Sequence, residues 1–190
     1  MISRIQNEPK LKSCIRYEIE DEGIEVGVDE KLTHSEYAGV KVDDYYNGLH
    51  DAAPPKAADY VVAVDNSCDS YNLYILEMKN VKEPKFLDIR AIQDKFSTTI
   101  NDFLSIRFKD IFLSDKYKYK DICLYLVSDA YGAGGSFHSH EEYRKYLEKI
   151  DKKDSLKVDN NLGRKIYKFR NRFLTIQYEI PPNPVIHKTT

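Results

Sequence analysis

Residues 59–80 decide the fold, and they read DYVVAVDNSCDSYNLYILEMKN. Residues 59–64 are mostly apolar and β-branched, a composition that favours an extended strand. The next six residues, 65–70, are polar or small and are typical of a turn. Residues 71–81 predict a second strand, which Pro84 closes off because proline has no N–H to donate to a sheet. The stretch therefore predicts a β-hairpin.

The charged side chains of this hairpin gather at its open end. Glu77 and Lys79 point to the same face of the second strand, because side chains alternate along an extended chain. A turn centred near Ser67 and Cys68 pairs positions whose numbers sum to 135 or 136. The second register puts Asp59 beside Glu77, with Cβ atoms about 5 Å apart. A buried face does not normally end in charged groups without a partner or a task.

Two neighbouring carboxylates repel each other unless a cation lies between them. Oxygen ligands favour Mg²⁺, with Mn²⁺ as a substitute, so we expect Asp59, Glu77 and the backbone carbonyl of Met78 to bind metal. Such an ion polarises a phosphate and lowers the pKa of a bound water, and Lys79 would assist that water. In the alternative interpretation, Glu77 and Lys79 form an ordinary charged pair at the end of a surface strand.

The rest of the chain predicts an α/β protein with one central mixed β-sheet flanked by helices. Residues 86–108 repeat apolar side chains at spacings of three and four, as an amphipathic helix does. Residues 121–128 are mostly apolar, which is typical of a strand in the middle of a sheet. A polar helix at 139–149 and strands at 164–170 and 172–180 complete the pattern.

The N-terminal part is harder to interpret. Alternation of apolar and charged residues around Ile15 and Ile19 hints at a strand. Thr33-His34-Ser35-Glu36 has the spacing of a helix capping box, which predicts a helix that ends near Gly48. The length of 190 residues suits one domain, 1–190, with its core at about residues 33–128.

The set of Asp59, Glu77 and Lys79 resembles the PD-(D/E)XK nuclease superfamily, to which most type II restriction endonucleases belong. The pattern of that superfamily is an acid on one strand, then Glu or Asp, any residue and Lys on the partner strand. The resemblance covers roughly residues 50–128 and implies a restriction-endonuclease-like fold with these three residues as the catalytic set. The proline that often precedes the first acid is Ala58 here.

The resemblance also implies two accessory residues. Members of the superfamily often take a further carboxylate from a first helix, and Glu36 is the candidate, with Glu30 and Asp44 as rivals. They often carry a glutamine on the helix after the hairpin, which indicates Gln93. That glutamine would orient an active-site group or water, unless it is an ordinary amide on the helix surface.

Charge is distributed unevenly along the chain. The net charge is −2, but residues 1–80 hold 8 Lys and Arg against 16 Asp and Glu, while residues 144–172 hold 11 against 4. This suits an enzyme that gathers cations at one place and contacts a polyanion at another, although a solvated lysine-rich surface has the same composition. The candidate DNA contacts are Ser136, His138, Lys157, Arg164, Lys165, Lys168 and Arg170.

Other functional classes find little support. No apolar run approaches the ~18 residues of a membrane span. The three cysteines form no CxxC pair, as expected for reduced thiols in the cytoplasm. Gly132-Ala133-Gly134-Gly135 lacks the lysine of a phosphate-binding loop. We therefore expect a Mg²⁺-dependent endonuclease that cuts double-stranded DNA, most simply a homodimeric type II restriction enzyme. The alternatives are a repair, recombination or RNA-cutting nuclease of the same fold, and a non-catalytic nucleic-acid-binding or assembly protein.

Overall fold

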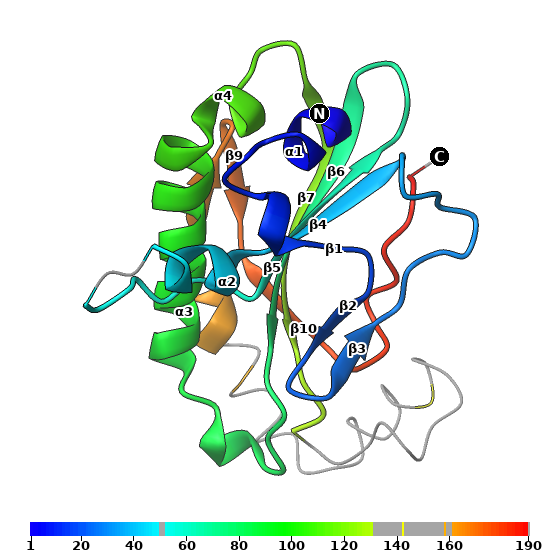
Figure 1. Ribbon diagram of the computed structural model, residues 1–190. Helices are drawn as coiled ribbons and strands as arrows, with labels where there is room; N and C mark the ends of the chain where they lie inside the picture. Colours follow the sequence, from blue (N-terminus) through cyan, green and yellow to red (C-terminus); the bar gives the residue numbers. More distant parts are fainter. Residues whose placement is uncertain (50–51, 131–141, 143–157, 159–160, 190) are drawn as a thin grey trace.

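The computed structural model describes residues 1–49, 52–130, 142, 158 and 161–189 (Figure 1). Several expectations fall outside these residues. They are the glycine-rich loop at 132–135, the helix at 139–149 except for residue 142, and the candidate DNA contacts Ser136, His138 and Lys157.

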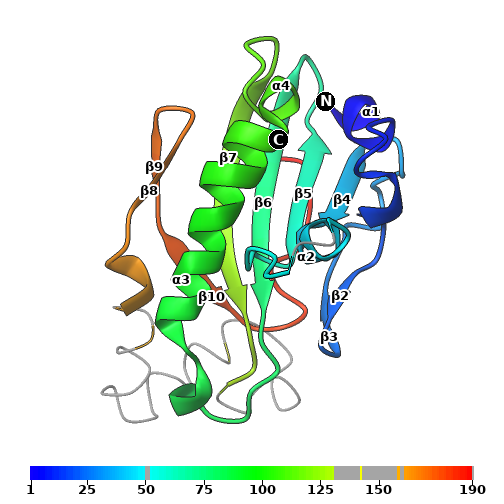
Figure 2. The same ribbon diagram turned by 60° about the vertical axis from the view of Figure 1, so that its left-hand side comes forward.

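The protein has a mixed α/β fold with a central six-stranded mixed sheet flanked by helices (Figures 1 and 2). The sheet order is β1-β4-β5-β6-β7-β10. The first four strands of this order pair antiparallel with one another, and β7 pairs parallel with both β6 and β10. The strands are β1 (Ile15–Arg16), β4 (Tyr37–Lys41), β5 (Tyr60–Asp65), β6 (Ser70–Met78), β7 (Lys118–Val127) and β10 (Ile176–Glu179).

The predicted hairpin is confirmed as β5 and β6. Tyr60 pairs with Leu76 and Asp65 pairs with Tyr71, so paired positions sum to 136, the second of the two registers. The turn takes three consecutive residues with positive φ, at Ser67, Cys68 and Asp69. Because this register is fixed, Asp59 lies just before the first pair and opposite Glu77.

The predicted helix after the hairpin is also confirmed, with shifted ends. Its first part is α3 (Ile89–Thr98), and Asp88 caps it by accepting the Ala91 N–H. It continues as a π-helical stretch, Thr99–Arg107, before a short α4 (Lys109–Phe112). Figure 2 shows α3 crossing one face of the sheet. The buried side chains that α3 and the π-helical stretch share with the core include Ile92, Phe96, Ile100, Phe103 and Leu104.

The helix expected from the capping-box spacing is wrong over most of its length. Glu36 does accept hydrogen bonds from the Thr33 N–H and hydroxyl, but the chain then enters β4. Only α2 (Val42–Asn47) is helical. Gly39 shows why, since a Cβ there would lie 2.5 Å from the Ile19 side chain and 2.7 Å from the Arg16 carbonyl. The close packing of residues 16–19 against Gly39 therefore favours a strand here, although the local sequence pattern predicts a helix.

Two small hairpins lie outside the main sheet. One joins β2 (Ile19–Asp21) and β3 (Ile24–Val26), and the other joins β8 (Tyr167–Phe169) and β9 (Arg172–Leu174). The expectation of a single sheet is therefore wrong for the C-terminal strands, of which only β10 joins it. At the N-terminus α1 (Ile2–Gln6) and a 3-10 turn (Lys12–Cys14) precede β1. No helix among the described residues is long and apolar enough to cross a membrane.

Candidate functional site

Asp59 and Glu77 are the two acidic side chains that the described part of the chain buries, at 2% and 0% exposure. Asp59 immediately precedes β5, and Glu77 is the penultimate residue of β6, so the hairpin register brings them together. Burying a carboxylate is costly unless another group compensates for the lost water. The surroundings of this pair are therefore where a function is to be sought.

The backbone of β6 is tied directly to Asp59. The Met78 N–H donates to Asp59 Oδ2 at 2.6 Å, and the Asp59 carbonyl accepts the Val42 N–H at 2.8 Å. The Met78 side chain is wholly buried in the second core cluster, which includes Val62 and Leu76. The Met78 N–H thus contacts the carboxylate of Asp59 and its side chain packs in the core, while the expected role of its carbonyl as a metal ligand stays a prediction.

Two lysines contact the carboxylate pair. Lys95 of α3 places its Nζ 2.7 Å from Glu77 Oε1 and 3.3 Å from Asp59 Oδ1. Lys79 lies 3.4 Å from Glu77 Oε1, but its shorter bond, 2.8 Å, is to Glu22 in the turn between β2 and β3. The sequence analysis missed Lys95. Its position three residues after Ile92 and next to Phe96, both buried, was the signal that it lies on the inner side of the helix.

One oxygen of the pair lacks a hydrogen-bond partner among the described residues. Glu77 Oε2 is buried and accepts no hydrogen bond from the described residues. Burial and the charge of Asp59 raise the pKa of Glu77 to about 8, against the opposing effect of Lys95. Burial also raises the pKa of Asp59. Burial lowers the pKa of Lys95, but the charges of Asp59 and Glu77 outweigh it and raise that pKa overall. The lysine thus stays charged, while both acids bind a proton more readily than exposed carboxyl groups do.

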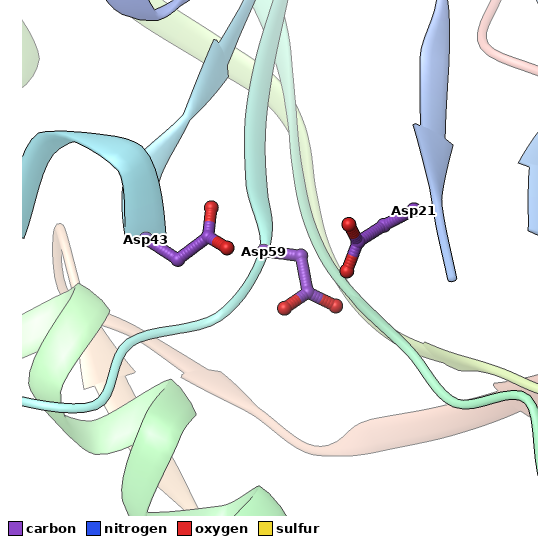
Figure 3. A group of neighbouring side chains, drawn as sticks. All are labelled: Asp21, Asp43 and Asp59. Atoms are coloured by element: carbon purple, nitrogen blue, oxygen red, sulfur yellow. The ribbon is translucent and has the colours of Figure 1, made fainter. Parts of the chain in front are cut away.

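A second acidic grouping shares Asp59. One carboxylate oxygen each of Asp21, Asp43 and Asp59 lies within 4.8 Å of the others. Figure 3 shows these carboxylates converging from β2, α2 and the start of β5. Lys41 pairs with Asp21 at 2.7 Å. Burial and the charge of Asp59 raise the pKa of Asp43 to about 6. Glu36 was expected to bring a further carboxylate here from a helix, but the carboxylate that α2 brings near Asp59 is that of Asp43. Neither Asp43 nor Asp21 was predicted from the sequence.

The accessory residues expected from the resemblance lie elsewhere. Glu36 is next to Asp65, at the opposite end of β5 from Asp59, and it pairs with Lys188. Its rival Asp44 pairs with Arg16 at 2.7 Å.

Gln93 also turns away from the carboxylates. Its Nε2 donates to the Asn161 carbonyl at 3.0 Å, so it holds the C-terminal segment against α3. Neither Glu36 nor Gln93 contacts the carboxylate pair, because Glu36 lies at the other end of β5 and the Gln93 amide donates to Asn161.

The basic segment is partly used for internal contacts. The Arg170 guanidinium donates to the carbonyls of Leu113, Ser114 and Tyr117, so it holds this loop in place, and its expected contact with DNA stays a prediction. Lys165 lies 3.3 Å from Asp94 on α3. The candidate contacts that stay exposed in the described part are Arg164 and Lys168.

Comparisons of the chain with protein-family models, with curated proteins and with solved structures find no match. The chemistry of its own residues is therefore what indicates a function. Five carboxylates stand close to three lysines, an excess of negative charge that suits a divalent cation. They are Asp21, Glu22, Asp43, Asp59 and Glu77, with Lys41, Lys79 and Lys95. The donors are hard oxygens, which fit Mg²⁺ or Mn²⁺.

Proposed function

We propose that the chain is a Mg²⁺-dependent deoxyribonuclease of the PD-(D/E)XK kind. The observation that carries the proposal is the buried pair of Asp59 and Glu77, with Glu77 Oε2 left without a hydrogen bond among the described residues. A buried ion pair that serves stability alone needs its remaining lone pairs satisfied. An unsatisfied carboxylate oxygen within an excess of acids instead suits a position where a cation binds.

The arrangement of elements supports a restriction-endonuclease-like fold. The hairpin of β5 and β6 is followed by α3 across one face and then by β7, which runs parallel to β6. This is the order of hairpin, helix and strand that the resemblance implies. Asp43 on α2 also supplies an acid from a helix before the hairpin.

In this proposal, Asp59, Glu77 and the Met78 carbonyl hold Mg²⁺. Mg²⁺ held there would polarise the phosphodiester and would lower the pKa of a water molecule. Burial lowers the pKa of Lys79, but the bond to Glu22 and the charges of Glu77 and Asp59 outweigh it and raise the pKa above its usual value. Lys79 is then an ammonium at neutral pH. It orients the attacking water and offsets charge on the phosphorane instead of removing a proton.

Double-stranded DNA is the proposed substrate, and a type II restriction endonuclease is the proposed class. Exposed Arg164 and Lys168 would contact its phosphates. Cutting both strands of a symmetric site calls for two related active sites, so the active form would be a homodimer. Sedimentation of the active enzyme measures this directly, because a homodimer has twice the mass of one chain.

The test is incubation of plasmid and phage DNA with about 10 mM Mg²⁺, a concentration that fills weak carboxylate sites. Wild type is compared with Asp59→Asn, and with Glu83→Gln as a control because Glu83 is exposed near the start of α3. Discrete fragments from wild type and the control alone support a restriction enzyme. A smear of fragments supports a nuclease without sequence specificity. Cutting of RNA but not DNA supports a nuclease whose substrate is RNA. Failure of wild type to cut DNA or RNA contradicts the proposal and favours a non-catalytic role.

A further inference from the structure

Lys95 enters the carboxylate pair from a helix, whereas Lys79 comes from the hairpin itself. It lies on the side of α3 that packs on the sheet, and its side chain is only 19% exposed. Its Nζ contacts one oxygen of each carboxylate, at 2.7 Å for Glu77 and 3.3 Å for Asp59. The ammonium therefore bridges the two acids and is largely shielded from water.

The other lysines of the site have different partners. Lys79 is bonded most closely to Glu22, and Lys41 to Asp21. Among the described residues, the ion pairs that join one cation to both Asp59 and Glu77 are those of Lys95. Lys95 bridges two carboxylates with one positive charge. A bound metal ion would bridge the same oxygens in the same way.

We propose that Lys95 is a built-in counterion that occupies the divalent-cation position between Asp59 and Glu77, and that Mg²⁺ displaces its ammonium toward solvent. This inference rests on the proposed function, since the competing ion is the cofactor proposed there. Without metal, the ammonium keeps two buried acids from facing each other without compensation. With metal, the flexible four-carbon stem lets the ammonium leave while the helix stays in place.

The exchange has a functional consequence. A cation must compete with Lys95, so the site fills at a higher cation concentration than the bare carboxylates would need. Asp21 and Asp43 lie beside Asp59 and favour a doubly charged ion over the single charge of the ammonium. Lys95 thereby sets the cation threshold of the enzyme and stabilises its metal-free form.

The first test follows the wild-type lysine itself, so that no variant has to fold. The protein is acetylated briefly at its lysines in EDTA or in saturating Mg²⁺ at equal ionic strength, and modified peptides are quantified by mass spectrometry. Modification of Lys95 is expected to rise several-fold with Mg²⁺. Lys85, which is 65% exposed and pairs with Glu83, serves as the internal control and should not change.

The second test measures Mn²⁺ affinity by titration, at the same pH and ionic strength for wild type and all variants. Lys95→Met is expected to bind Mn²⁺ at least about tenfold more tightly than wild type, because a charge-assisted competitor is gone. Lys95→Arg keeps the charge and should not show this gain. Arg90→Met removes one charge from an exposed position on the same helix and controls for long-range electrostatics.

The outcomes separate this inference from the proposed function. The melting temperature shows whether Mg²⁺ has bound. If it has bound and the modification of Lys95 does not change, the counterion role of Lys95 is overturned and the proposed nuclease function is not affected. The counterion role is also overturned if Lys95→Met binds Mn²⁺ no more tightly than Arg90→Met does. Absence of any Mg²⁺ or Mn²⁺ binding by wild type and by Lys95→Met overturns both.

Discussion

Burial raises the pKa of both Asp59 and Glu77, and this has a consequence for stability. The pKa of Glu77 is raised to about 8 from 4.5, first by burial and then by the charge of Asp59. An acid whose pKa is raised on folding contributes stability that is complete below its unfolded pKa and is lost as the pH rises through its folded pKa. The metal-free protein should therefore lose stability between about pH 4.5 and 8.

Replacement of Glu77 by glutamine should remove the upper part of this pH dependence. Asp43, whose pKa is raised to about 6, contributes at lower pH and remains in Glu77→Gln. We expect the free energy of unfolding in EDTA to fall less steeply from pH 6 to 8 for the variant than for wild type, since only Asp43 and Asp59 still have raised pKa values. Urea unfolding at several pH values measures this. Parallel curves for the two proteins would show that Glu77 is ionised in the metal-free fold.

Neighbouring aspartates on α2 offer a matched comparison. The Asp43 carboxylate lies near Asp59, whereas Asp44 pairs with Arg16 at the surface. Asp43→Asn should weaken Mn²⁺ binding by about tenfold, the scale seen when groups around a metal site are altered. Asp44→Asn should leave it nearly unchanged, because exposed ion pairs contribute little. Equal affinities in the two variants would remove Asp43 from the site.

The sequence could place some of these residues and not others. Asp59 and Glu77 were predictable as neighbours, because one short turn fixes the alternation of both strands. Asp21 and Asp43 belong to elements whose packing no local pattern determines. The apolar spacing of α3 could place Lys95 on the inner side of the helix, but not beside the two acids. Glu36 was misplaced because a turn with the hydrogen bonds of a capping box leads into a strand.

Among the helices and strands, those that depend on residues close in sequence were predicted correctly. The spacing of apolar residues found α3, and Pro84 explains its later start, since a 3-10 turn at Pro84–Phe86 precedes it. The C-terminal strands were predicted to join the main sheet, but β8 and β9 form a separate hairpin. Arg170 and Asn171 adopt positive φ and form the turn of that hairpin, and the pairing of β10 with β7 depends on contacts distant in sequence.

Packing of β1 against β4 requires Gly39. Its Cβ in Gly39→Ala would meet the Arg16 carbonyl at 2.7 Å, and that backbone cannot rotate away as a side chain end can. We expect a loss of about 1–3 kcal/mol in the free energy of unfolding, as for other overpacked sites. Gly163→Ala is the control, since no atom lies within 4 Å of its added Cβ. A loss of the same size in both variants would assign the effect to glycine itself.

At the scale of the whole molecule, the sheet separates two core clusters, and the carboxylates lie at one end of it. The helix-covered cluster includes Val61, Ile75 and Phe96, while the other includes Val62, Leu76 and Met78. The hairpin thereby holds Asp59 and Glu77 between rigid layers. A site built in this way keeps its geometry whether or not a cation is bound, and the exchange of Lys95 for metal needs only side-chain movement.

The rate of plasmid DNA hydrolysis in Mg²⁺ and in EDTA, by wild type and by Glu77→Gln, decides whether the buried carboxylates form a metal-dependent active site. Glutamine keeps the shape of the side chain and removes the charge that would bind the ion. The account predicts hydrolysis by wild type in Mg²⁺, none in EDTA, and a loss of at least about a hundredfold in the variant. Hydrolysis by Glu77→Gln at the wild-type rate, or by wild type in EDTA, would contradict it.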